Sequence, residues 1–117
     1  LGSMEYACKV AGAKLVMVLG HEHCGAVKSA IDDVKLGNIT ALLTKIKPAL
    51  LKSQDFTGEK TSKNEAFVKH VCENNIRNTI EQIRAKSPIL KEMETKGQIK
   101  IVGAYFDLSD SSLEFVQ

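Results

Sequence analysis

Several features are missing from this 117-residue sequence, and each absence narrows the class of protein. No apolar run approaches the roughly 20 residues that a membrane-spanning helix needs, and no segment has the pattern of a secretory signal peptide. The 16 basic and 14 acidic residues are interspersed and leave a net charge of +2. Nothing therefore favours binding to nucleic acid or to an acidic membrane surface. We expect a soluble globular protein of a single domain.

Cysteines are few, and they are not arranged as a disulfide framework. There are three of them, an odd number, at positions 8, 24 and 72. Small secreted domains stabilised by disulfides carry more cysteines, in even numbers and at short spacings. The sequence therefore predicts a protein of a reducing compartment, and we expect it to be cytoplasmic.

Common catalytic signatures are also absent. The chain has no G-x-S-x-G nucleophile turn, no P-loop and no G-x-G-x-x-G dinucleotide fingerprint. Asp32 and Asp33 lie in the middle of a predicted helix without a partner carboxylate, so we interpret them as part of a solvated face. The remaining chemistry lies in one short segment near the N-terminus.

That segment is Lys14–Ala30, KLVMVLGHEHCGAVKSA. Its first part, Lys14–Leu19, is short, uniformly apolar and rich in valine, which predicts a strand buried on both faces of a parallel sheet. His21, His23 and Cys24 follow directly, and a helix-like stretch of small residues comes after them. Because ligands of open α/β sheets bind at the carboxyl ends of strands, this turn is the candidate site.

The rest of the chain is predicted to be mostly helical, with one further parallel strand and a hairpin. The expected elements are a helix at Met4–Ala11, a helix at Ala26–Leu36 ended by Gly37, a helix from Ile39 to Leu50 capped by Asn38 and interrupted at Pro48, a polar loop at Gln54–Lys63, a long helix at Asn64–Ala85, a short helix opening at Ser87–Pro88, a strand at Ile99–Phe106 and an edge strand at Ser112–Val116. This order predicts an α/β fold: a partly parallel sheet with flanking helices and a C-terminal hairpin strand. Two parallel strands and one hairpin strand form a small sheet for the amount of predicted helix, so the pattern is typical of part of a larger fold.

The spacing His21-x-x-Cys24 suits zinc, because imidazole nitrogen and thiolate sulfur are both favoured zinc ligands. His23 is a candidate third ligand, but it would point away from His21 in an extended turn and is better interpreted as solvated. The predicted helix at Asn64–Ala85 carries one apolar stripe, formed by Val68, Cys72, Ile76, Ile80 and Ile83. Cys72, on this stripe, and Cys8, in the first predicted helix, are expected to be core residues. Two alternatives stay open at this point: a strand-end turn without metal, and a thiolate–imidazole nucleophile pair that uses Cys24.

The sequence resembles a known family over essentially its whole length. Gly20–Val27, GHEHCGAV, looks like the second zinc motif of the beta-class carbonic anhydrases, and Gly97–Asp107, GQIKIVGAYFD, is similar to their last parallel strand. The resemblance implies a zinc enzyme that interconverts carbon dioxide and bicarbonate, with His21 and Cys24 as two of its zinc ligands. It also implies a homodimer or a higher homo-oligomer.

One part of the family pattern has no counterpart here. The first zinc motif, Cys-x-Asp-x-Arg, which supplies the remaining cysteine ligand and an Asp–Arg pair, does not occur in the sequence. The resemblance therefore predicts that residues 1–117 form a beta-carbonic-anhydrase-like domain that is incomplete at its N-terminus, lacks one or more strands, and is inactive alone. The alternative is a non-catalytic binding or assembly module with an incomplete metal site. Without the first strand, one side of Lys14–Leu19 is expected to be exposed.

Overall fold

The fold consists of a three-stranded sheet, six α-helices and one π-helical turn. The computed structural model describes residues 1–117. In chain order the elements are α1 (Gly2–Glu5), the π-helical turn η1 (Tyr6–Val10), β1 (Leu15–His21), α2 (Gly25–Ile31), α3 (Gly37–Thr44), α4 (Lys47–Lys52), α5 (Glu65–Lys86), α6 (Pro88–Thr95), β2 (Lys100–Phe106) and β3 (Leu113–Val116). None of the helices combines the length and hydrophobicity that crossing a membrane would require.

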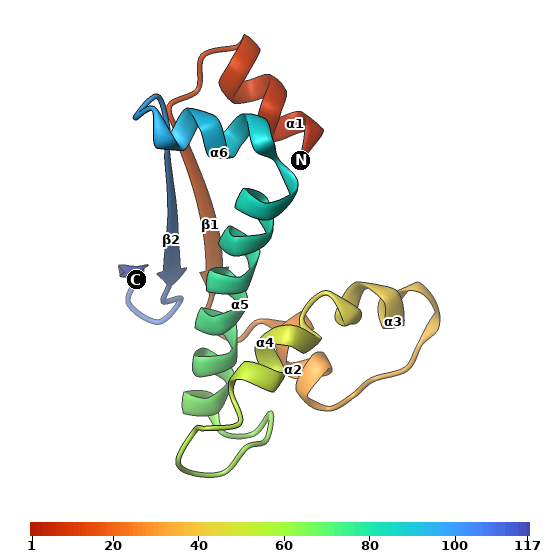
Figure 1. The fold of residues 1–117 in the computed structure, drawn as a ribbon. Helices are drawn as coiled ribbons and strands as arrows, with labels where there is room; N and C mark the ends of the chain where they lie inside the picture. The colour runs from red at the N-terminus through yellow and green to blue at the C-terminus, as the bar shows by residue number, and fades with distance from the viewer.

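The sheet has the strand order β1-β2-β3. β1 and β2 run parallel, in a register that places Leu15 opposite Lys100 and His21 opposite Phe106. β3 returns antiparallel to β2. Figure 1 shows both parallel strands pointing the same way, with α1 and α6 near their amino ends and α2 to α4 in a group to one side. The α/β class, the crossover between the parallel strands and the hairpin are confirmed.

Helix α5 covers one face of the sheet. Asn64 caps it by accepting a hydrogen bond from the Ala66 amide at 3.2 Å. The predicted apolar stripe is confirmed on its sheet-facing side, where Val68, Cys72, Ile76 and Ile83 are buried. The packing is close enough to require glycine on β2: a Cβ on Gly103 would lie 2.5 Å from Cγ2 of Ile76.

The buried side chains form two main clusters that meet at α5. The first, near the carboxyl ends of the strands, comprises Val27, Ala49, Phe67, Val68, Val71, Cys72, Ile76 and Tyr105. The second, near the amino ends, comprises Cys8, Ile83, Leu90, Met93, Ile99 and Ile101. The prediction that Cys8 and Cys72 are core residues is therefore confirmed, and the two belong to opposite ends of the molecule.

The prediction that the first strand is buried on both faces is wrong. β1 alternates along its length, and Leu15, Met17 and Leu19 remain 53%, 37% and 55% exposed. The cause is that α5 packs on one face only, while no helix of this chain covers the other. In the parallel ladder, the Lys100 amide donates to the Lys14 carbonyl and the Glu22 amide donates to the Phe106 carbonyl. Every second residue of β1 therefore bonds to β2, and the amides and carbonyls of the three exposed residues between them face away from β2. β1 is thus an edge strand with an open side.

Several helix boundaries also differ from the predictions. At the N-terminus, α1 and the π-helical turn η1 take the place of the single helix predicted at Met4–Ala11, and Cys8 is the buried residue of η1. The helix after the turn at His21–Cys24 ends at Ile31 instead of Leu36.

Gly37 was expected to end a helix, but it begins α3. Leu36, not Asn38, is the N-cap, and the hydroxyl of Thr40 accepts its amide at 2.7 Å. The Thr40 hydroxyl therefore satisfies the amide of the N-cap residue at the start of this helix. The predicted break at Pro48 is confirmed, since Pro48 lies in the first turn of α4.

Candidate metal centre

The two candidate ligands lie on one tight turn between β1 and α2. His21 is the last residue of β1, and Cys24 is the N-cap of α2. Between them, His23 adopts a left-handed conformation with φ of 59°, which reverses the chain direction within two residues. The turn lies at the carboxyl end of β1, where parallel α/β sheets bind their ligands.

The imidazole of His21 is oriented by its own turn. Its Nδ1 lies 2.9 Å from the carbonyl oxygen of Glu22, so Nδ1–H donates there and the neutral tautomer leaves the lone pair on Nε2. Metal-ligating histidines are commonly fixed in this way, by a backbone carbonyl that binds the second nitrogen. Cys24 is a free, half-buried cysteine whose sulfur makes no capping bond to α2. Both donor atoms are therefore available.

His23 does not join them. Its Nδ1 lies 3.1 Å from Oε2 of Glu65, at the start of α5, and its side chain is half exposed. Lys28 binds the other oxygen of Glu65 at 3.1 Å, and the pKa of Glu65 is lowered mainly by that hydrogen bond and further by His23. The ring of His23 is thus held at the surface by its hydrogen bond with Glu65.

Cys72, which was predicted only to be a core residue, lies next to the turn between β1 and α2. The thiol is buried, and burial raises its pKa to about 11; the neighbouring Cys24 raises it further, while a hydrogen bond with the backbone of His21 opposes the rise. The sulfur also lies against Gly20, at the end of β1. The apolar stripe of α5 placed Cys72 on the sheet-facing side, but nothing in the sequence indicated which end of the sheet it would meet.

No third ligand converges on His21 and Cys24. No group of three or more histidine, cysteine, aspartate or glutamate side chains in the chain is placed to hold a metal ion. The donor chemistry fits two positions of a tetrahedral zinc site, which needs four ligands in all, and the remaining positions have no donor in residues 1–117.

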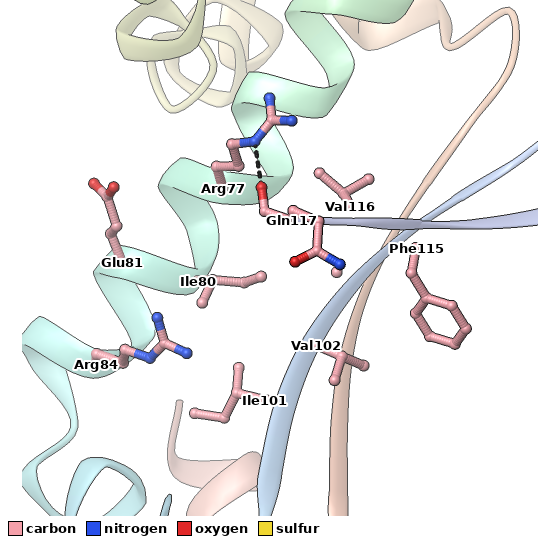
Figure 2. Close-up of a pocket in the computed structure, with 10 residues that line it drawn as sticks. Arg77, Ile80, Glu81, Arg84, Ile101, Val102, Phe115, Val116 and Gln117 are labelled. Carbon is pink, nitrogen blue, oxygen red and sulfur yellow. Dashed lines mark hydrogen bonds between the residues drawn. The ribbon is translucent and has the colours of Figure 1, made fainter.

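The largest cavity, about 510 Å³, lies elsewhere, between α5 and the β2–β3 hairpin. Figure 2 shows Arg77 at one end of it, where Nε donates to the carbonyl of Gln117 at 2.7 Å. Arg84, at the other end, is held by both carboxylate oxygens of Glu94, at 2.8 and 2.7 Å. Neither candidate ligand lines this cavity, and its two guanidinium groups are already engaged. It is therefore not part of the candidate metal centre.

Comparison with known proteins identifies the family. The family model described as carbonic anhydrase matches residues 1–113. The chain is 33% identical over 119 residues to a carbonic anhydrase of Mycolicibacterium smegmatis, which covers 97% of this chain and 54% of the relative. It is 30% identical over 115 residues to carbonic anhydrase 2 of Mycobacterium tuberculosis, covering 94% and 52%. The chain thus spans about half the length of the curated relatives that it matches.

Solved structures agree on the fold. One of two tetrameric beta-carbonic anhydrases from Sordaria macrospora superposes with a TM-score of 0.83 at 18% identity, over 98% of this chain and 58% of that one. The beta-carbonic anhydrase CafA of Aspergillus fumigatus gives a TM-score of 0.80 at 22% identity, over 99% and 54%. The chain belongs to the carbonic anhydrase family, and its fold is that of the beta class.

Proposed function

We propose that this chain is part of a zinc enzyme that hydrates carbon dioxide reversibly to bicarbonate, a lyase reaction, with His21 and Cys24 as two of the zinc ligands. The observation that carries the proposal is the turn after β1. It brings an imidazole with a free Nε2 and a free thiol together at the carboxyl end of a parallel strand. Membership of the carbonic anhydrase family supports the assignment of the substrate.

A zinc ion held there would act as a Lewis acid that lowers the pKa of a coordinated water to about 7, so that hydroxide is available at neutral pH. The residues of this chain would present donor atoms to the zinc ion. His21 presents Nε2 because Glu22 occupies its other nitrogen. Cys24 contributes a negative sulfur once its proton has left. The half-buried position of Cys24 at the start of α2 shields that sulfur partly from water while leaving it accessible.

We further propose that the missing ligands come from polypeptide outside residues 1–117, and that this chain alone has little activity. Two donors give weak zinc binding, and no third donor lies nearby. The open side of β1 supports the same idea, because an exposed apolar strand edge pairs readily with another strand. A groove of about 340 Å³, lined by Met4, Val16, Met17 and Ile83 among others, runs beside that edge. A homo-oligomer is the expected assembly.

A second function is favoured by the incomplete donor set: a carbonic-anhydrase-like module that binds or assembles without catalysis. The two proposals differ in metal content. One zinc per assembled site, lost in His21→Ala and in Cys24→Ser, supports the enzyme. A folded protein that holds no zinc when purified without chelators, and does not take it up, supports the module.

The experiment measures zinc by mass spectrometry and carbon dioxide hydration by stopped flow in the assembled protein, together with the polypeptide that supplies the remaining ligands, as wild type and as both variants. His23→Ala is the matched control, since it removes an imidazole from the same turn without removing a proposed ligand. We expect zinc and activity to fall together in His21→Ala and Cys24→Ser and to stay near the wild-type level in His23→Ala. Zinc retained in both ligand variants would contradict the assignment.

A further inference from the structure

The turn that carries the two proposed ligands is attached to the β2–β3 turn through the side chain of Glu22. Oε1 of Glu22 accepts two hydrogen bonds from one residue, Ser109: the amide at 3.1 Å and the hydroxyl at 2.9 Å. The amide of Glu22 donates to the carbonyl of Phe106 at 2.9 Å. Glu22 therefore joins two turns that are 87 residues apart in the sequence.

The β2–β3 turn that carries Ser109 is itself ordered by short-range hydrogen bonds. The Ser109 amide also donates to Oδ1 of Asp107 at 2.8 Å, and the Asp107 amide donates to the carbonyl of Ser112 at 2.9 Å. Oδ1 of Asp110 accepts the Ser112 amide at 2.9 Å. These side-chain to backbone bonds close the turn that carries Ser109, and the Ser109 amide is shared between Asp107 and Glu22.

Glu22, which binds Ser109 through its side chain, also binds the proposed ligand His21 through its backbone carbonyl. The carbonyl of Glu22 is the acceptor for Nδ1–H of His21, so the peptide of Glu22 decides how the imidazole ring is turned. The two bonds to the carboxylate and the bond from the Glu22 amide restrain the side chain and the backbone of Glu22 on the amino-terminal side of its carbonyl, and so limit the movement of that carbonyl. The side chain of Glu22 is partly buried, at 21% exposure.

We propose that Glu22 is a positioning residue of the metal centre: its carboxylate, bound by Ser109, fixes the carbonyl that orients His21. The proposal rests on the proposed function, because it takes His21 as a metal ligand. Glu22 does not touch the metal. It acts through His21, and Ser109 acts through Glu22.

The test uses cobalt(II) as the probe, titrated into the 117-residue chain, with the thiolate-to-cobalt charge-transfer band as the signal for Cys24. We expect Glu22→Ala to raise the dissociation constant for cobalt(II) about 10-fold or more, the range found when the outer hydrogen-bond partner of a ligand is removed. Glu22→Gln keeps an oxygen acceptor for both Ser109 donors and should bind nearly as well as the wild type. Glu92→Ala is the matched control, because Glu92 lies on α6, near the amino ends of the strands, in an exposed pair with Lys96.

Ser109→Ala removes the hydroxyl and keeps the amide donor, so we expect a smaller loss of affinity in the same direction. The double variant Glu22→Ala/Ser109→Ala should bind no worse than Glu22→Ala alone, since the two residues act as one unit. The proposal is overturned if Glu22→Ala binds like the wild type. It is also overturned if Glu22→Gln loses as much as Glu22→Ala, because the negative charge would then matter and not the hydrogen bonds.

A second measurement does not depend on metal. Hydrogen–deuterium exchange of the metal-free chain should show faster exchange of the Glu22 amide in Glu22→Ala, and unchanged exchange in Glu22→Gln. If the wild-type chain bound no cobalt(II), the metal-binding part of this proposal would be overturned for the isolated chain, whereas the proposed function is tested separately by the zinc content of the assembled protein. The exchange data would then still decide whether Glu22 orders the turn, and equal exchange in all variants would overturn that role.

Discussion

The sulfur of Cys72 lies against the backbone of Gly20, at the point where α5 meets the end of β1. A Cβ atom on Gly20 would come within 2.6 Å of that sulfur and 2.8 Å of Cδ1 of Ile76. We therefore expect Gly20→Ala to lower the free energy of unfolding by about 1–3 kcal/mol, the usual cost of overpacking a filled interior. Urea denaturation followed by circular dichroism measures the change.

A double-mutant cycle separates this contact from a general effect of adding a methyl group. Cys72→Ala removes the sulfur, so Gly20→Ala should cost less in that background than in the wild type. Gly25→Ala is the control, because a Cβ at Gly25 would meet nothing within 4 Å. Equal costs of Gly20→Ala in both backgrounds would show that the sulfur does not limit this site.

The three cysteines should react with iodoacetamide in a set order under native conditions. Cys24 is half-buried and should be alkylated first, whereas Cys8 and Cys72 are both only 4% exposed. Burial also raises the pKa of Cys72 to about 11, so its reactive thiolate is scarce at pH 8.

Mass spectrometry of the labelled peptides gives the order. Zinc added beforehand should slow the labelling of Cys24 and leave the other two unchanged. Labelling of Cys24 that is insensitive to zinc would speak against its role as a ligand.

Much of the fold follows from local patterns in the sequence. The apolar stripe of the long helix predicted α5 within one residue at each end, because burial of an apolar face acts over neighbouring residues. The start of α3 was missed: the helix begins at Gly37, and the hydroxyl of Thr40 accepts the amide of its N-cap, Leu36. The exposed face of β1 has another origin. Hydrophobicity predicts that a strand needs cover, but not whether the same chain supplies it.

The candidate site was only partly predictable. The spacing of His21 and Cys24 follows directly from the sequence, and the structure places both residues on one turn. The contact of Glu22 with Ser109 could not be predicted, because it joins two turns through the parallel pairing of β1 and β2, and no local pattern marks it. The closeness of Cys72 to the turn depends in the same way on how α5 lies across the sheet.

Burial of Tyr105 should make the protein less stable at high pH. Desolvation, aided by nearby acidic groups, raises the pKa of Tyr105 to about 12. In the unfolded chain the phenol ionises near pH 10, so between pH 10 and 12 the unfolded state binds fewer protons and the free energy of unfolding falls.

The expected loss is on the order of 1–3 kcal/mol across that range. Urea denaturation at several pH values measures the slope, and Tyr105→Phe should flatten it. Tyr6→Phe, at an exposed position, is the control, and an unchanged slope in Tyr105→Phe would rule out Tyr105 as the cause.

The open edge of β1 should make the isolated chain associate. Leu15, Met17 and Leu19 expose apolar surface next to unpaired backbone groups, and such an edge pairs with a second strand unless charge or covering segments prevent it. Leu19→Lys places a charge on that face, so we expect the self-association constant measured by sedimentation equilibrium to fall about 10-fold or more, in line with the loss of one buried leucine. Leu51→Lys is the matched control, since Leu51 is 75% exposed on α4 and away from the sheet. If both variants associate like the wild type, β1 is not the surface through which copies of this chain meet, and the polypeptide that completes the metal centre must approach the turn from another side.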